Sequence, residues 1–177
     1  MNMERRAIFL DRDGVINVDT GYPHKTEDCQ LIPGAAAAIR RARREGYMIC
    51  VVTNQGGIAL GYYDEAGLRR FNDHLAGLLA EDGAALDAIH FCPHHPSSPD
   101  PARRQCSCRK PQPGMLLDLA REHNIDMSAS AMIGDRVTDI EAGEAAGVRA
   151  FLFDGGNLDT LMLKVLASLK EARDGEN

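Results

Sequence analysis

The sequence has no tryptophan, and aromatic residues make up only 5% of its 177 residues. Long hydrophobic runs are also missing, because no stretch approaches the roughly 18 apolar residues that a membrane-spanning helix needs. The first residues do not form a secretory signal, since the apolar stretch Ala7 to Leu10 is short and acidic residues follow at once. These absences predict a cytoplasmic protein with no membrane partner.

Excess positive charge is absent as well. The chain has 20 Lys and Arg against 26 Asp and Glu, which gives a formal net charge of −6. A negative protein repels polyanions, and few aromatic side chains are present to stack on bases, so we expect no nucleic-acid partner. A few local cations can still hold a small anionic ligand.

Short apolar runs alternate with helical stretches along the chain, without internal repeats. This alternation predicts an α/β fold, a doubly wound, Rossmann-like parallel sheet, in a single domain covering residues 1–177. The stretch from Cys92 to Pro113 is irregular and too long for a plain connection, so we expect a functional or metal-stapled loop there. The expected strands cover residues 6–10, 47–53, 87–92, 130–134 and 148–153.

Acidic side chains follow two of these strands. Asp11 and Asp13 come directly after the first strand, and Asp135 and Asp139 follow the fourth. Ligands bind at the carboxyl edge of such a sheet, where these acids meet. Two unit charges about 4 Å apart repel by about 1 kcal/mol in water and about 4 kcal/mol at an effective dielectric of about 20. The cluster therefore predicts a bound hard cation, and Mg²⁺ prefers carboxylates, water and phosphate oxygens.

A hydroxyl and a lysine join the acids at this edge. Thr53 ends the second strand, and Lys110 lies just before a predicted helix. With Mg²⁺ this set suits a phosphate group. We expect Asp11 to attack phosphorus and form an aspartyl phosphate, while Asp13 protonates the leaving oxygen and then deprotonates water. Each residue alone has a plainer explanation, such as a solvated charge or a helix cap, but their combination in order favours catalysis.

The loop after the third strand gathers three of the five cysteines together with two histidines. Cytoplasmic thiols stay reduced, so a disulfide framework is not expected. Soft ligands at this spacing fit a closed tetrahedral Zn²⁺ site, which would stiffen this zinc loop, residues 92–110. Spacing alone leaves open which histidine binds, and reduced thiols without a metal remain the alternative. The candidate ligands are Cys92, His94, His95, Cys106 and Cys108.

In this order the catalytic motifs resemble those of the haloacid dehalogenase-like (HAD) phosphatase superfamily. The match consists of a DxD motif at Asp11 and Asp13, a threonine after the next strand, a lysine, and the GDxxxD motif that begins at Gly134. The resemblance covers most of the chain. It implies that Mg²⁺ is held by Asp11, the backbone carbonyl of Asp13, and Asp135, with Asp139 behind them.

The segments DRDGVIN, DTGY, TNQGGI, CPHHP and CRKPQPGM further resemble one family of this superfamily, the heptose bisphosphate phosphatases. This resemblance implies a sugar bisphosphate substrate, and it selects Cys92, His94, Cys106 and Cys108 as the zinc ligands. The segment 14–33 is too short to hold a cap domain, and a predicted helix, a strand and the zinc loop take up 53–110, so we expect a capless enzyme. The implied substrate-binding residues are Asp19, Thr20, Gly21, Tyr22, Thr53, Asn54, Gln55, Gly56, Arg109, Lys110 and Arg136.

The nearest alternative is a histidinol-phosphate phosphatase, which by resemblance shares the catalytic set and the zinc loop. Arg109 and Arg136 favour a bisphosphate, because guanidinium groups bind phosphate in a bidentate fashion and a monophosphate would leave them idle. A receiver-like signalling domain is a further alternative. Such a domain has no acid/base residue two positions after its phosphorylated aspartate, where Asp13 stands here, and it has no zinc loop. We expect a monomer, because no heptad or apolar stripe is present, and the sequence leaves the preferred sugar anomer open.

Overall fold

A computed structural model describes residues 4–175, and its centre is a five-stranded, wholly parallel sheet. The strand order is β3-β2-β1-β4-β5, so the prediction of a doubly wound parallel sheet is confirmed. Each strand differs from its predicted bounds by at most one residue at either end. The strands are β1 (Arg6–Leu10), β2 (Tyr47–Asn54), β3 (Ala88–Cys92), β4 (Ala131–Gly134) and β5 (Arg149–Leu152).

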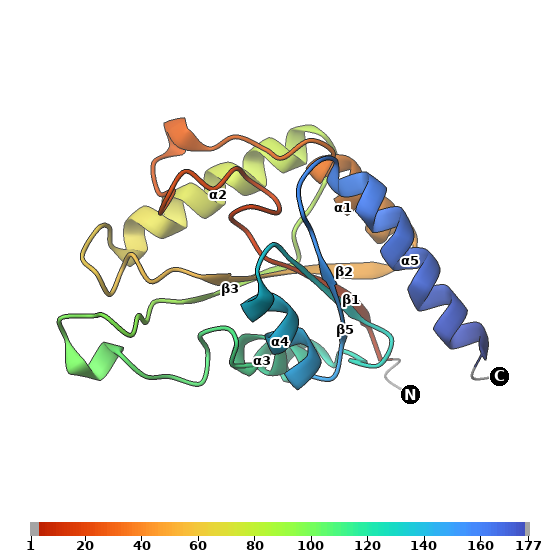
Figure 1. The fold of residues 1–177 in the computed structure, drawn as a ribbon. Helices are drawn as coiled ribbons and strands as arrows, with labels where there is room; N and C mark the ends of the chain where they lie inside the picture. Colours follow the sequence, from red (N-terminus) through yellow and green to blue (C-terminus); the bar gives the residue numbers. More distant parts are fainter. Residues whose placement is uncertain (1–3, 176–177) are drawn as a thin grey trace.

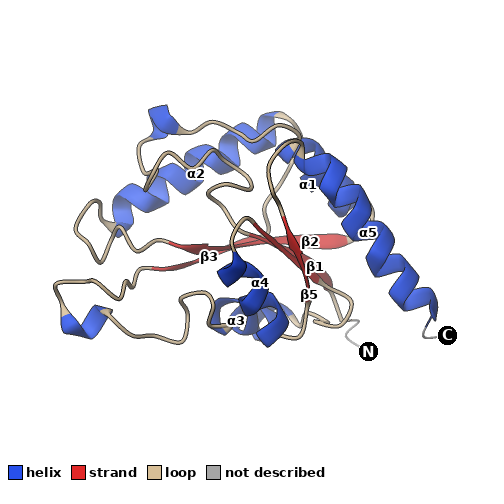
Figure 2. Cartoon of the chain, viewed as in Figure 1, coloured by secondary structure: helices blue, strands red, loops and turns tan. Residues whose placement is uncertain are grey.

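Helices cover both faces of the sheet (Figures 1 and 2). One apolar cluster joins α1, α2 and α5 to one face through side chains such as Ile39, Leu75 and Met162. The other cluster joins α3 and α4 to the opposite face, with Leu116 and Ala142 at its centre. The helices are α1 (Ala35–Arg44), α2 (Glu65–Glu81), α3 (Gly114–His123), α4 (Val137–Ala145) and α5 (Leu158–Gly175), with 3-10 turns at Thr26–Asp28 and Pro101–Arg103.

Two aspartates, Asp64 and Asp139, accept hydrogen bonds from backbone N–H groups at the start of a helix. The Asp64 carboxylate accepts a hydrogen bond from the Gly67 N–H and caps α2, as the sequence predicts. At α4 the plainer explanation of the GDxxxD motif, a cap by Asp135, is wrong. Asp139 instead accepts the Arg136 N–H at 3.0 Å. This bond turns the Asp139 side chain back toward the end of β4.

The strand order reverses direction at β1, which lies between β2 and β4. A crevice forms at such a switch point beyond the carboxyl ends of the strands, and the residues after β1 and β4 flank it. Within residues 4–175, the connections beyond β1 and β2 carry loops, short turns, α2 and β3, and no cap domain. No described helix is both long and apolar enough to cross a membrane.

Candidate active site

A cleft of about 510 Å³ opens at the switch point. Almost all of the residues that sequence analysis assigned to catalysis or substrate binding line it. Thr20 does not line it, although its exposed neighbour Asp19 does. Tyr63 also lines the cleft, and no sequence motif marked it; Pro111, Val137 and Thr138 line it too and lie inside marked motifs without a predicted role. The predicted residues on the cleft are Asp11, Asp13, Asp19, Gly21, Tyr22, Thr53, Asn54, Gln55, Gly56, Arg109, Lys110, Arg136 and Asp139.

Lys110 is the buried cation at the floor of the cleft, where only 3% of the residue is exposed. Its Nζ lies 2.8 Å from Asp11 Oδ1 and 2.7 Å from Asp139 Oδ1, and it donates to the Val52 carbonyl. Burial by itself would lower the pKa of Lys110, but the charges of the two carboxylates outweigh it and raise that pKa. Lys110 therefore stays protonated and neutralises part of the acidic cluster.

Asp11 is the acid at the end of β1. Its Oδ1 also accepts the Arg12 backbone N–H at 2.8 Å, which together with Lys110 holds this oxygen in place. Burial raises the pKa of Asp11 to about 7, against the lowering effect of Lys110 and with the help of the Asp139 charge. Burial and the Asp139 charge likewise raise the pKa of Asp135. A bound cation would favour the ionised forms of both groups.

The acids fit a hard divalent cation. Ligand atoms of Asp11, Asp135 and Asp139 lie within 4.8 Å of one another. Among the described residues, Asp135 Oδ1 is buried and has no hydrogen-bond partner, as expected for an oxygen that a metal would engage. Gly14 makes room for it: its φ of +86° suits glycine, and a Cβ there would collide with the Asp135 carboxylate. These oxygens suit Mg²⁺.

Asp13 faces the same cleft, and polar side chains surround it. Arg12, Asn17 and Gln55 all donate hydrogen bonds to its carboxylate. Of these, only Gln55 had a role assigned from the sequence. Arginine is almost never fully buried, so a sequence pattern gives no reason to place Arg12 in the interior.

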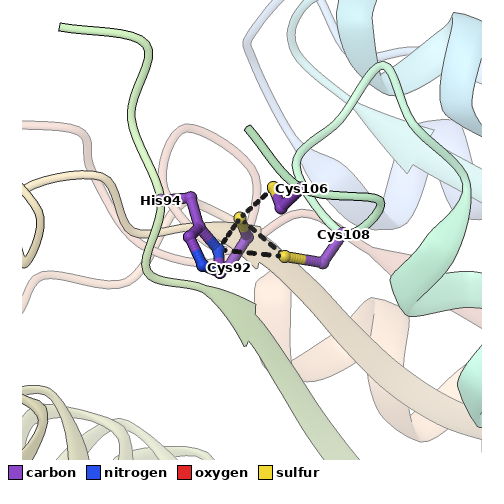
Figure 3. Close-up of side chains that lie close together, drawn as sticks. All are labelled: Cys92, His94, Cys106 and Cys108. Atoms are coloured by element: carbon purple, nitrogen blue, oxygen red, sulfur yellow. Dashed lines mark hydrogen bonds between the residues drawn. The ribbon is translucent and has the colours of Figure 1, made fainter. Parts of the chain in front are cut away.

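The zinc loop brings its ligands together as the resemblance implied (Figure 3). Zinc bonds of about 2.3 Å to sulfur and about 2.05 Å to nitrogen, in a tetrahedron, separate ligand atoms by about 3.5–3.8 Å. His94 Nδ1 lies 3.5 Å from Cys92 Sγ and 3.4 Å from Cys108 Sγ, and Cys92 Sγ lies 3.5 Å from Cys106 Sγ. The Cys92–Cys108 pair is closer, at 2.9 Å. The four side chains therefore form a cluster that could hold a zinc ion.

The choice between the histidines follows from where their rings lie. His94 turns into the cysteine cluster, whereas His95 Nδ1 accepts the Ser97 N–H outside it. Arg109 is bound to this loop, because its Nη1 donates to the His94 carbonyl and its N–H to Cys106 Sγ. The zinc loop thus fixes a cation that lines the cleft.

The rim of the cleft joins separate segments of the chain. Arg136 at the start of α4 pairs with Asp19 at 3.0 Å, and Tyr22 packs edge-on against Tyr62 with ring centres 5.0 Å apart. Arg104 of the zinc loop donates to the Ser98 carbonyl and does not line the cleft. The Arg136 side chain is 68% exposed, so a ligand can reach it.

The fold and this site define a HAD-like phosphatase. A family model described as HAD-hydrolase-like matches residues 107–172. D-glycero-beta-D-manno-heptose-1,7-bisphosphate 7-phosphatase of Photorhabdus laumondii is 42% identical over 96% of this chain and 95% of that protein. The enzyme of the same name from Escherichia coli K12 is 46% identical over 80% of this chain and 75% of that protein.

A solved structure agrees with these relatives. The crystal structure of D,D-heptose 1,7-bisphosphate phosphatase from B. bronchiseptica, complexed with magnesium and phosphate, superimposes with a TM-score of 0.76. It is 31% identical and covers 96% of this chain and 99% of that one. The chain belongs to the heptose-1,7-bisphosphate 7-phosphatase family of the HAD superfamily. It is a phosphoric monoester hydrolase, so the receiver-like alternative is wrong.

Proposed function

We propose that the protein hydrolyses the C7 phosphate of D-glycero-D-manno-heptose 1,7-bisphosphate in an Mg²⁺-dependent reaction, with the β anomer preferred. The observation that carries this proposal is one cleft that Asp11 and Lys110 line together with Arg109 and Arg136. A bisphosphate needs two cationic sites, one at the reacting phosphate and one beyond it. The names of the curated relatives support the heptose and its β anomer.

Asp11 and Asp13 divide the chemistry between them. Asp11 attacks phosphorus, the bond from phosphorus to the C7 oxygen breaks, and Asp13 gives its proton to that oxygen. Asp13 then takes a proton from water, which attacks the aspartyl phosphate and releases inorganic phosphate and free Asp11. Lys110 offsets the negative charge, and Thr53 with the neighbouring N–H groups donates to the phosphate oxygens.

The metal roles follow from the donor sets. Asp11, Asp135 and the backbone carbonyl of Asp13 would hold Mg²⁺, while Asp139 pairs with Lys110. The cation supplies positive charge that draws the phosphate to the nucleophile. Zn²⁺ on Cys92, His94, Cys106 and Cys108 would be structural, because four protein ligands leave no open position.

We also propose that one chain of 177 residues, a single domain, is sufficient as a monomer, because every proposed catalytic residue lies on the same cleft. Three thiol ligands require a reducing compartment, which supports the cytoplasm. The substrate would then be a soluble small molecule, with no nucleic acid or membrane as partner.

The test is phosphate release with Mg²⁺ from both anomers of heptose 1,7-bisphosphate and from histidinol phosphate. We expect kcat/KM for the β anomer to exceed that for histidinol phosphate by at least about 100-fold, or about 2.7 kcal/mol of transition-state binding. A preference for histidinol phosphate would overturn the assignment. Folded Asp11→Asn protein serves as the control for contaminating phosphatases, since it should release no phosphate.

A further inference from the structure

We propose that Arg12 is the positioning residue for the acid/base Asp13, which it anchors to helix α2. The inference rests on the proposed function only in giving Asp13 the acid/base role. Arg12 is fully buried and does not line the cleft, so it cannot touch the substrate. Its effect on the reaction must therefore pass through Asp13.

The Asp13 carboxylate is held at both oxygens. Its Oδ1 accepts Arg12 Nε at 2.8 Å and Asn17 Nδ2 at 2.9 Å. Its Oδ2 accepts Arg12 Nη2 and Gln55 Nε2, each at 3.0 Å. A carboxylate has about four lone-pair positions, so these four bonds fill them. The guanidinium takes one position on each oxygen and thereby fixes the plane of the carboxylate.

Arg12 is itself fixed by residues distant in sequence. Its Nη1 donates to Asn72 Oδ1 at 2.8 Å, and its Nη2 donates to the Pro23 carbonyl at 2.9 Å. The guanidinium carbon lies 4.4 Å from the centre of the Phe71 ring. Asn72 and Phe71 both belong to α2, so a rigid helix holds the guanidinium in place. Asp13, although it follows β1 on a turn, is therefore positioned by α2.

The two partners on Oδ2 have different roles. Gln55 lines the cleft and also bonds Thr53 Oγ1 and the Tyr63 hydroxyl, whereas Arg12 lies behind the carboxylate. The leaving oxygen of the substrate must meet the proton of Asp13 on the cleft side, at the position on Oδ2 that Gln55 occupies here. When the substrate replaces Gln55 there, the two hydrogen bonds from the Arg12 guanidinium to Asp13 are kept. A general acid must lie within hydrogen-bond reach of the oxygen it protonates. The position in which Arg12 holds Asp13 therefore sets catalytic efficiency.

Leaving-group dependence tests the proposal. Protonation matters for the alkoxide of a sugar phosphate, whereas the phenolate of p-nitrophenyl phosphate departs without a proton. Arg12→Lys keeps the charge and loses the fork. We expect it to lower kcat/KM for heptose bisphosphate by about 10- to 100-fold, and for p-nitrophenyl phosphate by less than about 3-fold. KM for the bisphosphate should change by less than about 3-fold, because Arg12 does not touch substrate.

Two comparisons separate positioning from folding. Arg41→Lys is the matched control, since Arg41 forms the same two-point bond, to Asp159, between α1 and α5. It should leave both substrates unaffected. If Arg12→Lys does not fold, the pair Asn72→Leu and Asn72→Asp replaces it. The first removes the acceptor of Arg12 Nη1 and should lower bisphosphate turnover selectively, and the second restores an acceptor and should rescue it.

Asp13→Asn separates the acid role of Asp13 from the positioning role of Arg12. Selective loss of bisphosphate turnover in Asp13→Asn supports the acid role, and equal loss on both substrates overturns that role. If Asp13→Asn is selective but Arg12→Lys lowers both substrates equally, or neither, the positioning proposal alone is overturned. In the Asp13→Asn background, Arg12→Lys should add no further selectivity, and added selectivity would also contradict the proposal.

Discussion

Replacing Asp11, the proposed nucleophile, should abolish activity and at the same time free the magnesium-free protein from a loss of stability that wild type suffers as the pH rises toward neutral. Asp11 is 7% exposed, and burial raises its pKa to about 7, although the unfolded chain would titrate near the ordinary value of 3.8. The folded wild type therefore binds this proton more tightly than the unfolded chain does. The stability it gains is complete below the unfolded pKa and is lost as pH rises through about 7. The amide that Asp11→Asn introduces does not titrate, so the variant escapes this loss.

The magnitude follows from linkage. Above about pH 5 the unfolded Asp11 carries no proton, while the folded one loses its proton around pH 7. Integrating about 1.36 kcal/mol per pH unit over the folded occupancy gives about 2 kcal/mol between about pH 5.5 and pH 8. The unfolding free energy of Asp11→Asn, relative to wild type, should therefore rise by about 2 kcal/mol over this range.

Urea denaturation of magnesium-free protein at the two pH values measures this difference. Chelators are left out, because they would also remove metal from the proposed zinc site. Asp159→Asn is the control: the Arg41 hydrogen bond lowers the pKa of Asp159, so its contribution is constant across this window and lost only in acid. Adding Mg²⁺ should stabilise wild type more than Asp11→Asn, by mass action. A difference between Asp11→Asn and wild type that does not change with pH would refute the reasoning.

Further predictions address the metals and the second phosphate. Cys106→Ser should lose zinc, thermal stability and activity together, and metal analysis that finds no zinc in reduced wild-type protein would contradict the site. Gly14→Ala should cost more than about 2 kcal/mol and remove the stabilisation by Mg²⁺, because its φ is +86° and the new Cβ meets Asp135. Arg136→Ala should raise KM for the bisphosphate by about 10-fold without changing p-nitrophenyl phosphate turnover, and its exposed bridge to Asp19 should contribute less than about 1 kcal/mol to stability. An unchanged KM would remove Arg136 from the substrate site.

The fold could be predicted well because its signals are local. Nearly continuous apolar runs indicate strands buried on both faces, as in β2. The N-cap residue Asp64 indicates where α2 begins. The parallel order then brings residues after β1, β2 and β4 to one edge without any long-range information. For the same reason the acids, Thr53 and Lys110 could be placed together before their distances were known.

What the sequence could not predict depends on contacts between distant segments. Arg12 and Asn72 are 60 positions apart, and neither residue type signals a buried bond. Asp139 was expected behind the magnesium ligands, and its ion pair with Lys110 depends on how α4 begins. Thr20 stands within the DTGY segment and still misses the cleft, since the local turn, and not its neighbours in sequence, sets where a side chain points. The sequence pattern therefore predicts where a motif lies in the fold, whereas packing determines which of its side chains reach the cleft.

The zinc loop bears directly on the proposed reaction, because it positions two consecutive cations of the cleft. Cys108 would bind the metal, Arg109 follows it with its side chain on the His94 carbonyl, and Lys110 comes next. Asn54 at the end of β2 bonds both the N–H and the carbonyl of Lys110, so the loop is fastened to the sheet on one side and by the metal on the other. In a capless enzyme no second domain can close over the substrate and position such groups. The proposed metal would make this loop rigid and give Arg109 and Lys110 fixed positions without closure, so loss of zinc should affect both substrate binding and the chemical step.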